Sequence, residues 1–148
     1  MQDDYDRLVE LIREFYEMDG HDFDASRVRQ GLAPLLSGDT FGQVWLVVDS
    51  CPVGLVGYAV VTWGWSLESG GKDALLDEVF MRVRGAGTGE ELLRHAMVAA
   101  KQAGARRMYL ETEVHNARAR SFYARLGFAP DDSVWMSRDL ADGETTDV

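Results

Sequence analysis

The sequence contains few residues of the types that form disulfides or metal centres. Cys51 is its only cysteine, and its three histidines, His21, His95 and His115, lie far apart in the chain. A single cysteine cannot close an intrachain disulfide, and a cysteine-based zinc site needs several such ligands. Because the histidines also lack the spacing of metal ligands, we expect no metal centre. The sparse cysteines also lead us to expect a cytoplasmic protein.

Long apolar runs and an excess of positive charge are missing as well. No stretch of 18 residues is apolar throughout, so no transmembrane helix is expected. The first ten residues, MQDDYDRLVE, are acidic and lack the apolar centre of a signal peptide. The formal net charge is -10, with 25 Asp and Glu against 15 Lys and Arg, and such a charge opposes binding to a polyphosphate backbone. We therefore expect neither nucleic acid nor a membrane as partner, but an attraction for cationic molecules.

The spacing of apolar residues predicts one domain in which helices and strands alternate in mixed order. Helices are expected over residues 3–19, 25–36 and 90–103, and directly after Asn116. Strands are expected over residues 43–48, 53–65, 75–83, 108–112 and 134–136. The order α-α-β-β-β-α-β-α-β indicates an α/β (α+β) fold. The domain should span residues 1–140, followed by an acidic tail over 141–148.

A glycine-rich stretch, Arg84 to Glu90 (RGAGTGE), lies between an expected strand and an expected helix. Glycines let a ligand approach the backbone closely. The N–H groups and the dipole at the start of a helix favour an anion such as a phosphate. A nucleotide P-loop is excluded, because the pattern GxxxxGK(S/T) is absent. Taken alone, the stretch is equally consistent with a structural turn.

A dinucleotide or S-adenosylmethionine site is a second interpretation of this loop. Such sites pair a GxGxG loop with an acidic residue about 20 positions further on, which holds ribose hydroxyls. Glu111 lies 22 residues after Gly89. The position in the chain argues against this interpretation, because those folds begin with the glycine loop and build several strand–helix units after it. Here only 37 residues follow Glu111.

A third interpretation combines the loop with a second motif downstream. Arg84 to Gly89 matches R/Q-x-x-G-x-G/A, and Asn116 to Phe128 matches N-x-x-A-x-x-F-Y-x-x-L-G-F. With these two motifs in this order and a strand between them, the chain resembles the GNAT superfamily of acyl-CoA N-acetyltransferases over nearly its whole length. The resemblance implies a mixed, mostly antiparallel twisted sheet flanked by helices, with acetyl-CoA as co-substrate.

The resemblance also implies which residues hold the co-substrate. Backbone N–H groups of the loop would bind the CoA pyrophosphate, a role that carries over to Arg84, Gly85, Ala86, Gly87, Thr88, Gly89 and Glu90. Many relatives carry a lysine where Ala86 stands, so one phosphate-facing cation is missing here. Val79, Phe80 and Met81 would pair with the pantetheine arm and orient the acetyl carbonyl. The link from this strand to the loop is shorter than in most relatives, which leaves the strand register open. Asn116 would contact the pantetheine or pyrophosphate region.

Two catalytic roles follow from the same resemblance. Tyr123 would donate a proton to the departing CoA thiolate. A carboxylate must remove a proton from the acceptor, and Glu78 and Glu111 are our candidates in that order, with Asp77 as a third. Asp77 and Glu78 interrupt an apolar strand, and neighbouring strand residues point to opposite faces, so only one of them should face a cleft. The amine would attack the thioester directly, because no residue stands out as a nucleophile.

The acceptor is predicted less closely than the co-substrate. Residues 1–24 contain nine acidic side chains against Arg7 and Arg13, and Trp63 and Trp65 could stack on a cation. A cationic primary amine, such as a polyamine, an aminoglycoside or a peptide terminus, is therefore the hypothesis for the acceptor. The alternative function is a module of the same fold that binds acyl-CoA without turnover. Members of the family are often dimers, so a homodimer is a further expectation.

Overall fold

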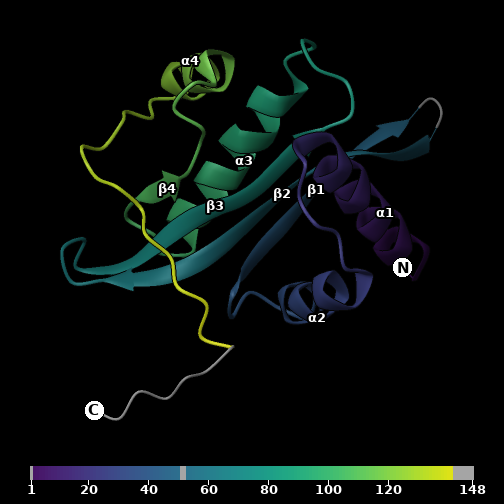
Figure 1. Cartoon of the computed structure of the whole chain (residues 1–148), viewed down its shortest axis with the longest axis horizontal. Helices are drawn as coiled ribbons and strands as arrows, with labels where there is room; N and C mark the ends of the chain where they lie inside the picture. The colour runs from purple at the N-terminus through teal and green to yellow at the C-terminus, as the bar shows by residue number, and fades with distance from the viewer. Residues whose placement is uncertain (1, 51–52, 142–148) are drawn as a thin grey trace.

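Two amphipathic helices begin the chain, and the rest of the fold is built on one sheet. The computed structural model describes residues 2–50 and 53–141, so Cys51 lies outside the described part (Figure 1). Its helices are α1 (Gln2–Asp19), α2 (Ala25–Leu36), α3 (Thr88–Gln102) and α4 (Ala117–Arg125). Its strands are β1 (Gly42–Ser50), β2 (Val53–Ser66), β3 (Gly71–Met81) and β4 (Met108–Leu110). The expected α/β (α+β) class is confirmed, and the expected order of elements is confirmed as far as α4.

The sheet is mixed, and helices cover both of its faces. Its strands lie in the order β1-β2-β3-β4; the first two neighbouring pairs are antiparallel, and β3 and β4 are parallel. Side chains of α1 and α2 form one core with alternate residues of β2 and β3, among them Leu11, Leu32 and Tyr58. Side chains of α3 and α4 form a second core on the other face, around Val61, Leu93 and Ala96. Figure 1 shows the two helix pairs on opposite sides of the sheet.

A β-bulge in β3 decides which face each side chain near the bulge reaches. Val60 pairs with Glu78 and Val61 pairs with Leu76, so Asp77 is an extra residue without a partner on β2. One extra residue reverses the alternation of faces along the strand. Leu76 therefore belongs to the core of α3 and α4, whereas Glu78 points toward α1. Without the bulge, Glu78 would lie on the same face as Leu76.

β3 and β4 run side by side for a short distance and then separate. The register of the pair covers only three residues of each strand, Ala74 to Leu76 and Met108 to Leu110. Within the described residues, the outer edge of β3 from Asp77 to Met81 has no strand beside it. The parallel pair therefore opens toward the end of β3 that leads into the glycine loop.

One expected strand is wrong. Residues 134–136 form no strand in the structure, and Val134 and Met136 are 87% and 91% exposed. One physical reason is that β4 offers only three residues for pairing. The other is that the segment buries too little apolar surface to offset the conformational entropy that a strand would lose. The expected tail over 141–148 lies outside the described residues except for Ala141. No helix within 2–50 and 53–141 is long and apolar enough to span a bilayer.

Candidate functional site

Glu78 lies between two tyrosines that come from different elements. Tyr58 on β2 donates a hydrogen bond to Glu78 Oε1 at 2.8 Å, and Tyr16 on α1 donates one to Glu78 Oε2. Tyr58 is completely buried, and its ring packs against Phe15 and Phe80. Both carboxylate oxygens thus have a phenol donor, next to the aromatic rings that pack around Tyr58.

The environment raises the pKa of Glu78 above its ordinary value. Burial is the largest cause, because a desolvated carboxylate prefers its neutral form, and the negative charge of Asp77 acts in the same direction. The hydrogen bonds from Tyr16 and Tyr58 and the nearby His21 lower the pKa and offset part of this increase. Asp77 as a residue is exposed, yet the surrounding chain partly desolvates its carboxyl group, and this raises its pKa too. Because its pKa is raised, the Glu78 carboxylate is a stronger base than an ordinary glutamate, which suits a proton acceptor.

The connection between α1 and α2 borders the same carboxylate. The His21 ring stacks edge-on against Tyr16, with ring centroids 5.8 Å apart, and its Nε2 lies 2.7 Å from Asp19. Asp24 instead caps α2, accepting a hydrogen bond of 3.1 Å from the N–H of Arg27. Of the acidic residues expected to attract a cation, Asp24 therefore has a structural role.

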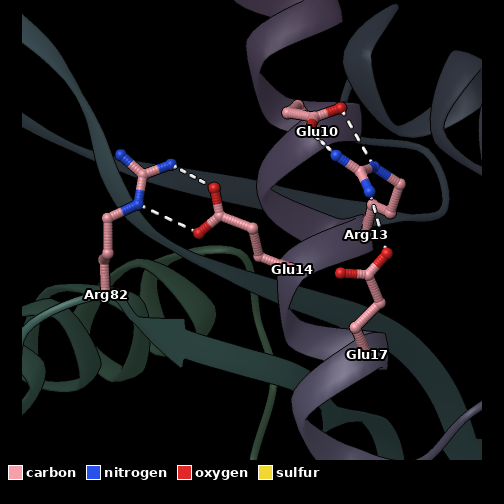
Figure 2. A network of polar contacts seen from close by, with 5 residues as sticks. All are labelled: Glu10, Arg13, Glu14, Glu17 and Arg82. Carbon is pink, nitrogen blue, oxygen red and sulfur yellow. Dashed lines mark hydrogen bonds and ion pairs between the residues drawn. The ribbon is translucent and has the colours of Figure 1, made fainter.

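An ion-pair network holds α1 against the end of β3 (Figure 2). Arg82 forms a bidentate pair with Glu14, at 3.0 Å from Nε and 2.7 Å from Nη2, and donates a third bond to the carbonyl of Leu55. On the same helix, Arg13 pairs with Glu10 and Glu17. Glu14 lies about half a turn before Tyr16 on α1, so this network fixes the helix that brings the Tyr16 hydroxyl to Glu78.

The glycine loop has the shape of an anion site. Gly85 and Gly87 adopt φ values of 89° and 78°, a left-handed conformation that side chains with a Cβ disfavour. A Cβ placed at either glycine would meet no atom within 4 Å, so the backbone there is open to a ligand. Gly87 is the N-terminal cap of α3 and offers no side-chain hydrogen bond to the helix. The first N–H groups of α3 thus remain available beside the exposed Arg84.

The open edge of β3 presents two amides. The N–H of Arg82 bonds to the carbonyl of Val56 on β2. In an antiparallel pair, alternate residues direct their N–H groups to the same side, so the N–H of Phe80 also points to β2. The N–H groups of Val79 and Met81 then point to the open edge. In the pairing of β3 with β2, Val79 lies opposite Ala59 and Met81 lies opposite Gly57.

Helix α4 meets both the loop and the strand. A Cβ at Gly89 would lie 3.5 Å from Met81 Cγ and 3.8 Å from Phe122 Cζ, so the start of α3, the end of β3 and α4 converge there. Burial raises the pKa of the neighbouring Tyr123 phenol, and the positive charge of Arg84 partly counteracts this. Tyr123 is therefore a neutral phenol near neutral pH, close to the loop.

In the described part of the chain, the structure shows no hydrogen bond or ion pair between the remaining predicted site residues and Glu78. Asn116 caps α4 through a 3.1 Å hydrogen bond from Ala119 N–H, as its position before a helix predicts. Glu111 follows the end of β4 and is exposed; no hydrogen bond or ion pair joins it to another described residue. Trp63 packs against the core of α3 and α4, with Lys72 over its ring. Its Nε1 donates a hydrogen bond to the backbone carbonyl of Asp39, whereas Trp65 is exposed. Within 2–50 and 53–141, no three potential metal ligands gather.

The comparison with known sequences now decides the family. A sequence profile of the Acetyltransferase (GNAT) family matches residues 5–128, most of the chain. The chain belongs to the GNAT acetyltransferase family. The profile ends at Phe128, the last residue of the second motif, so both motifs lie inside the matched region. The comparison with curated proteins found no match.

Solved structures agree with this GNAT fold. An integron cassette protein from the mobile metagenome of Cole Harbour Salt Marsh is 29% identical, with a TM-score of 0.79 over 92% of this chain and 84% of that one. A "possible acetyltransferase" from Clostridium difficile 630 also has a TM-score of 0.79, at 19% identity over 95% and 93% of the two chains. A "probable acetyltransferase" has a TM-score of 0.75, at 22% identity over 90% and 93%. At these lower identities, the likeness supports the fold alone.

Sequence reasoning did not find the two tyrosines that hold Glu78. Tyr16 and Tyr58 belong to the apolar faces of a helix and a strand, where a tyrosine is usually a core residue. A buried acid needs donors, so Glu78 in an apolar strand indicates that partners exist. The sequence does not indicate that those partners lie 62 and 20 positions away.

Proposed function

We propose that this GNAT protein transfers the acetyl group of acetyl-CoA to a primary amine in a ternary complex. The observation that carries the proposal is the continuous path along the open edge of β3. It runs from the outward N–H groups of Val79 and Met81 to the glycine loop at the start of α3. Glu78 lies on the same stretch of strand, pointing toward α1, and Tyr123 lies beside the other end of the path, near Arg84.

The residues of this path suit the parts of acetyl-CoA. The loop amides and Arg84 would hold the pyrophosphate, in a space where no Cβ at Gly85 or Gly87 would meet a neighbour. The amides of Val79 and Met81 would hydrogen-bond the pantetheine arm and the acetyl carbonyl, whose oxygen gains negative charge during attack. Bound in this way, acetyl-CoA supplies an activated acyl group.

Two side chains of the protein would move protons. An amine is protonated at neutral pH and attacks only after losing a proton. Glu78 would accept that proton, directly or through a water, while Tyr16 and Tyr58 hold its carboxylate in place. Tyr123, a neutral phenol, would give a proton to the leaving sulfur. The amine nitrogen forms the new bond to the acyl carbon, and the carbon–sulfur bond breaks.

A second function has one observation in its favour. The two tyrosine hydrogen bonds to Glu78 also join α1 to β2 and β3, so this carboxylate could serve as a structural anchor in a protein that binds acyl-CoA without turnover. Under that alternative, the loop would still bind CoA, but Glu78 and Tyr123 would have no chemical role.

Calorimetric titration with acetyl-CoA, followed by measurement of CoA-thiol release across a panel of amines, tests the proposal. We expect binding together with amine-dependent thiol release. The matched variants are Tyr123→Phe, which removes only the phenol oxygen, and Tyr5→Phe, which makes the same change on α1, where the hydroxyl donates to the carbonyl of Arg29. Loss of turnover in the first variant alone, with unchanged acetyl-CoA binding, supports catalysis. Binding without release for every amine favours the non-catalytic alternative.

A further inference from the structure

A groove of about 380 Å³ lies on the sheet face that Glu78 also occupies. Its floor comes from β2 and β3, through Thr62, Gly64, Asp73 and Leu75, with Tyr109 from β4 at one side. Trp135, from the segment after α4, also lines it. Figure 1 shows this C-terminal segment, in yellow, crossing the sheet rather than joining it as a strand.

The strand register places the groove in line with Glu78. Val60 pairs with Glu78, Thr62 pairs with Leu75, and Gly64 pairs with Asp73. Because alternate residues of β2 share a face, these three pairs follow one another along the same surface. The groove begins one pair beyond the proposed proton acceptor and ends at Asp73.

Asp73 supplies the groove with a carboxylate that has no partner. Within residues 2–50 and 53–141, it forms no hydrogen bond or ion pair. Gly64 makes room for it: a Cβ at Gly64 would lie 2.3 Å from Asp73 Oδ1, so the carboxylate lies across the glycine of the neighbouring strand. Among the described residues, none of those that line the groove is basic.

Aromatic rings complete the surroundings of this carboxylate. Tyr109 and Trp135 both line the groove, and Trp135 is 64% exposed although it is a large apolar side chain. The guanidinium of Arg107 lies 5.5 Å from the centre of the Tyr109 ring and occupies one face of it, so a ligand cation would rely on Asp73 and Trp135. A groove lined by both a carboxylate and aromatic rings, in a chain of net charge -10, suits an alkylammonium group.

We propose that this groove binds a second cationic group of the acceptor, which is therefore an elongated diamine or polyamine with one amine at Glu78 and another at Asp73. The inference rests on the proposed acetyl transfer and specifies its substrate class. A strand advances about 3.3 Å per residue, so the five steps from Asp73 to Glu78 span about 16 Å at most, less the shortening at the bulge. The acceptor must accordingly place two amines many methylenes apart.

A series of α,ω-diaminoalkanes of four to twelve carbons, each compared with the n-alkylamine of equal length, tests the spacing. In thiol-release assays, kcat/KM for the diamines should rise with length and should exceed that of the matched monoamine roughly fivefold or more at the long end. Equal kcat/KM for diamines and monoamines at every length would overturn the inference.

Variants then locate the effect. Asp73→Asn should abolish the advantage of the long diamines and leave the monoamines unchanged, whereas Glu68→Gln removes the same charge from the exposed turn nearby and should leave the advantage intact. Gly64→Ala keeps the charge but displaces the carboxylate, so it should act like Asp73→Asn. Trp135→Ala should weaken the advantage, and Trp65→Ala, at another exposed tryptophan, should not. Equal effects of Asp73→Asn and Glu68→Gln would show that the advantage comes from the net negative charge of the protein, and would overturn binding in the groove.

Binding without turnover separates the two proposals. Calorimetry with 1,12-diaminododecane and n-dodecylamine, on the wild-type protein and on Asp73→Asn, needs no acetyl transfer. Tighter diamine binding that depends on Asp73, without thiol release, would support the groove and contradict the proposed function. Thiol release from amines without any dependence on Asp73 would support the function and contradict the groove.

Discussion

Tyr58 donates a hydrogen bond of 2.8 Å to Glu78 across the β2–β3 pair, and it does so from a completely buried position. The bulge at Asp77 is what turns Glu78 toward this tyrosine and toward Tyr16. The arrangement holds a half-buried carboxylate against an apolar core, beside the open edge of β3. Its cost in desolvation is difficult to explain by stability alone.

The pH dependence of acetyl transfer should respond to the two tyrosines. Their hydrogen bonds lower the pKa of Glu78, so Tyr58→Phe should raise that pKa and move the acidic limb of the kcat/KM profile to higher pH. Asp77→Asn removes a charge that raises the pKa and should move the same limb to lower pH. If the acidic limbs of the kcat/KM profiles coincide for the wild type, Tyr58→Phe and Asp77→Asn, Glu78 is not the titrating base.

The stability of the protein should depend on the charge of Glu78 in the opposite sense to most carboxylates. Because its pKa in the folded protein is raised, the group favours folding at low pH, and this contribution is lost as pH rises through the raised pKa. Glu78→Gln should therefore match or exceed the wild-type Tm near neutral pH while losing activity, with a smaller difference near pH 4. The measurement is the Tm of Glu78→Gln minus the Tm of the wild type at each pH. A difference that is lower at neutral pH than at acid pH would contradict this sign.

The loop glycines should matter for CoA binding through backbone conformation. Gly87→Ala places a Cβ in the left-handed region, at a cost of about 1–2 kcal/mol, and relaxation of the loop should move the amides away from the pyrophosphate. We expect about tenfold weaker CoA binding by calorimetry. Gly104→Ala is the control, since Gly104 also has a positive φ with open space around it but follows the other end of α3. Equal losses of affinity in both variants would indicate a general effect on stability.

The Arg82–Glu14 pair should stabilise the docking of α1. The two side chains are 46% and 35% exposed, so solvent screens the pair and a double-mutant cycle should give a coupling of about 0.5–1 kcal/mol. The Arg94–Glu90 pair within α3 is equally short, at 2.7 Å, and should give about 0.3–0.5 kcal/mol. Both couplings should shrink at high salt. A coupling near zero for Arg82–Glu14 would show that packing alone positions α1.

The sequence predicted most of the fold because most of its elements have a clear apolar period. Helix 25–36 has the same bounds in the structure, and the expected N-cap at Asn116 is present. The strand over 134–136 failed because Val134, Trp135 and Met136 form an apolar run without partners, and no local pattern reveals that β4 has only three residues.

The candidate site was predicted in part for similar reasons. The loop and the strand before it are continuous in sequence, so their motif identifies them together. The hydrogen bond from Tyr58 to Glu78 depends on the register of β2 and β3 and on the bulge. The hydrogen bond from Tyr16 depends on how α1 docks on the sheet. Asp73 and Trp135 lie 62 positions apart and meet only because the C-terminal segment crosses the sheet.

The most direct test of the account compares Glu78→Gln with the wild type in one assay of acetyl-CoA binding and amine-dependent thiol release. The account predicts unchanged acetyl-CoA affinity and a loss of about 100-fold or more in kcat near neutral pH, because a positioned base contributes about that much. Part of the loss should disappear as pH rises and more of the free amine is already deprotonated. An unchanged kcat in Glu78→Gln would contradict the central claim that this carboxylate is the proton acceptor.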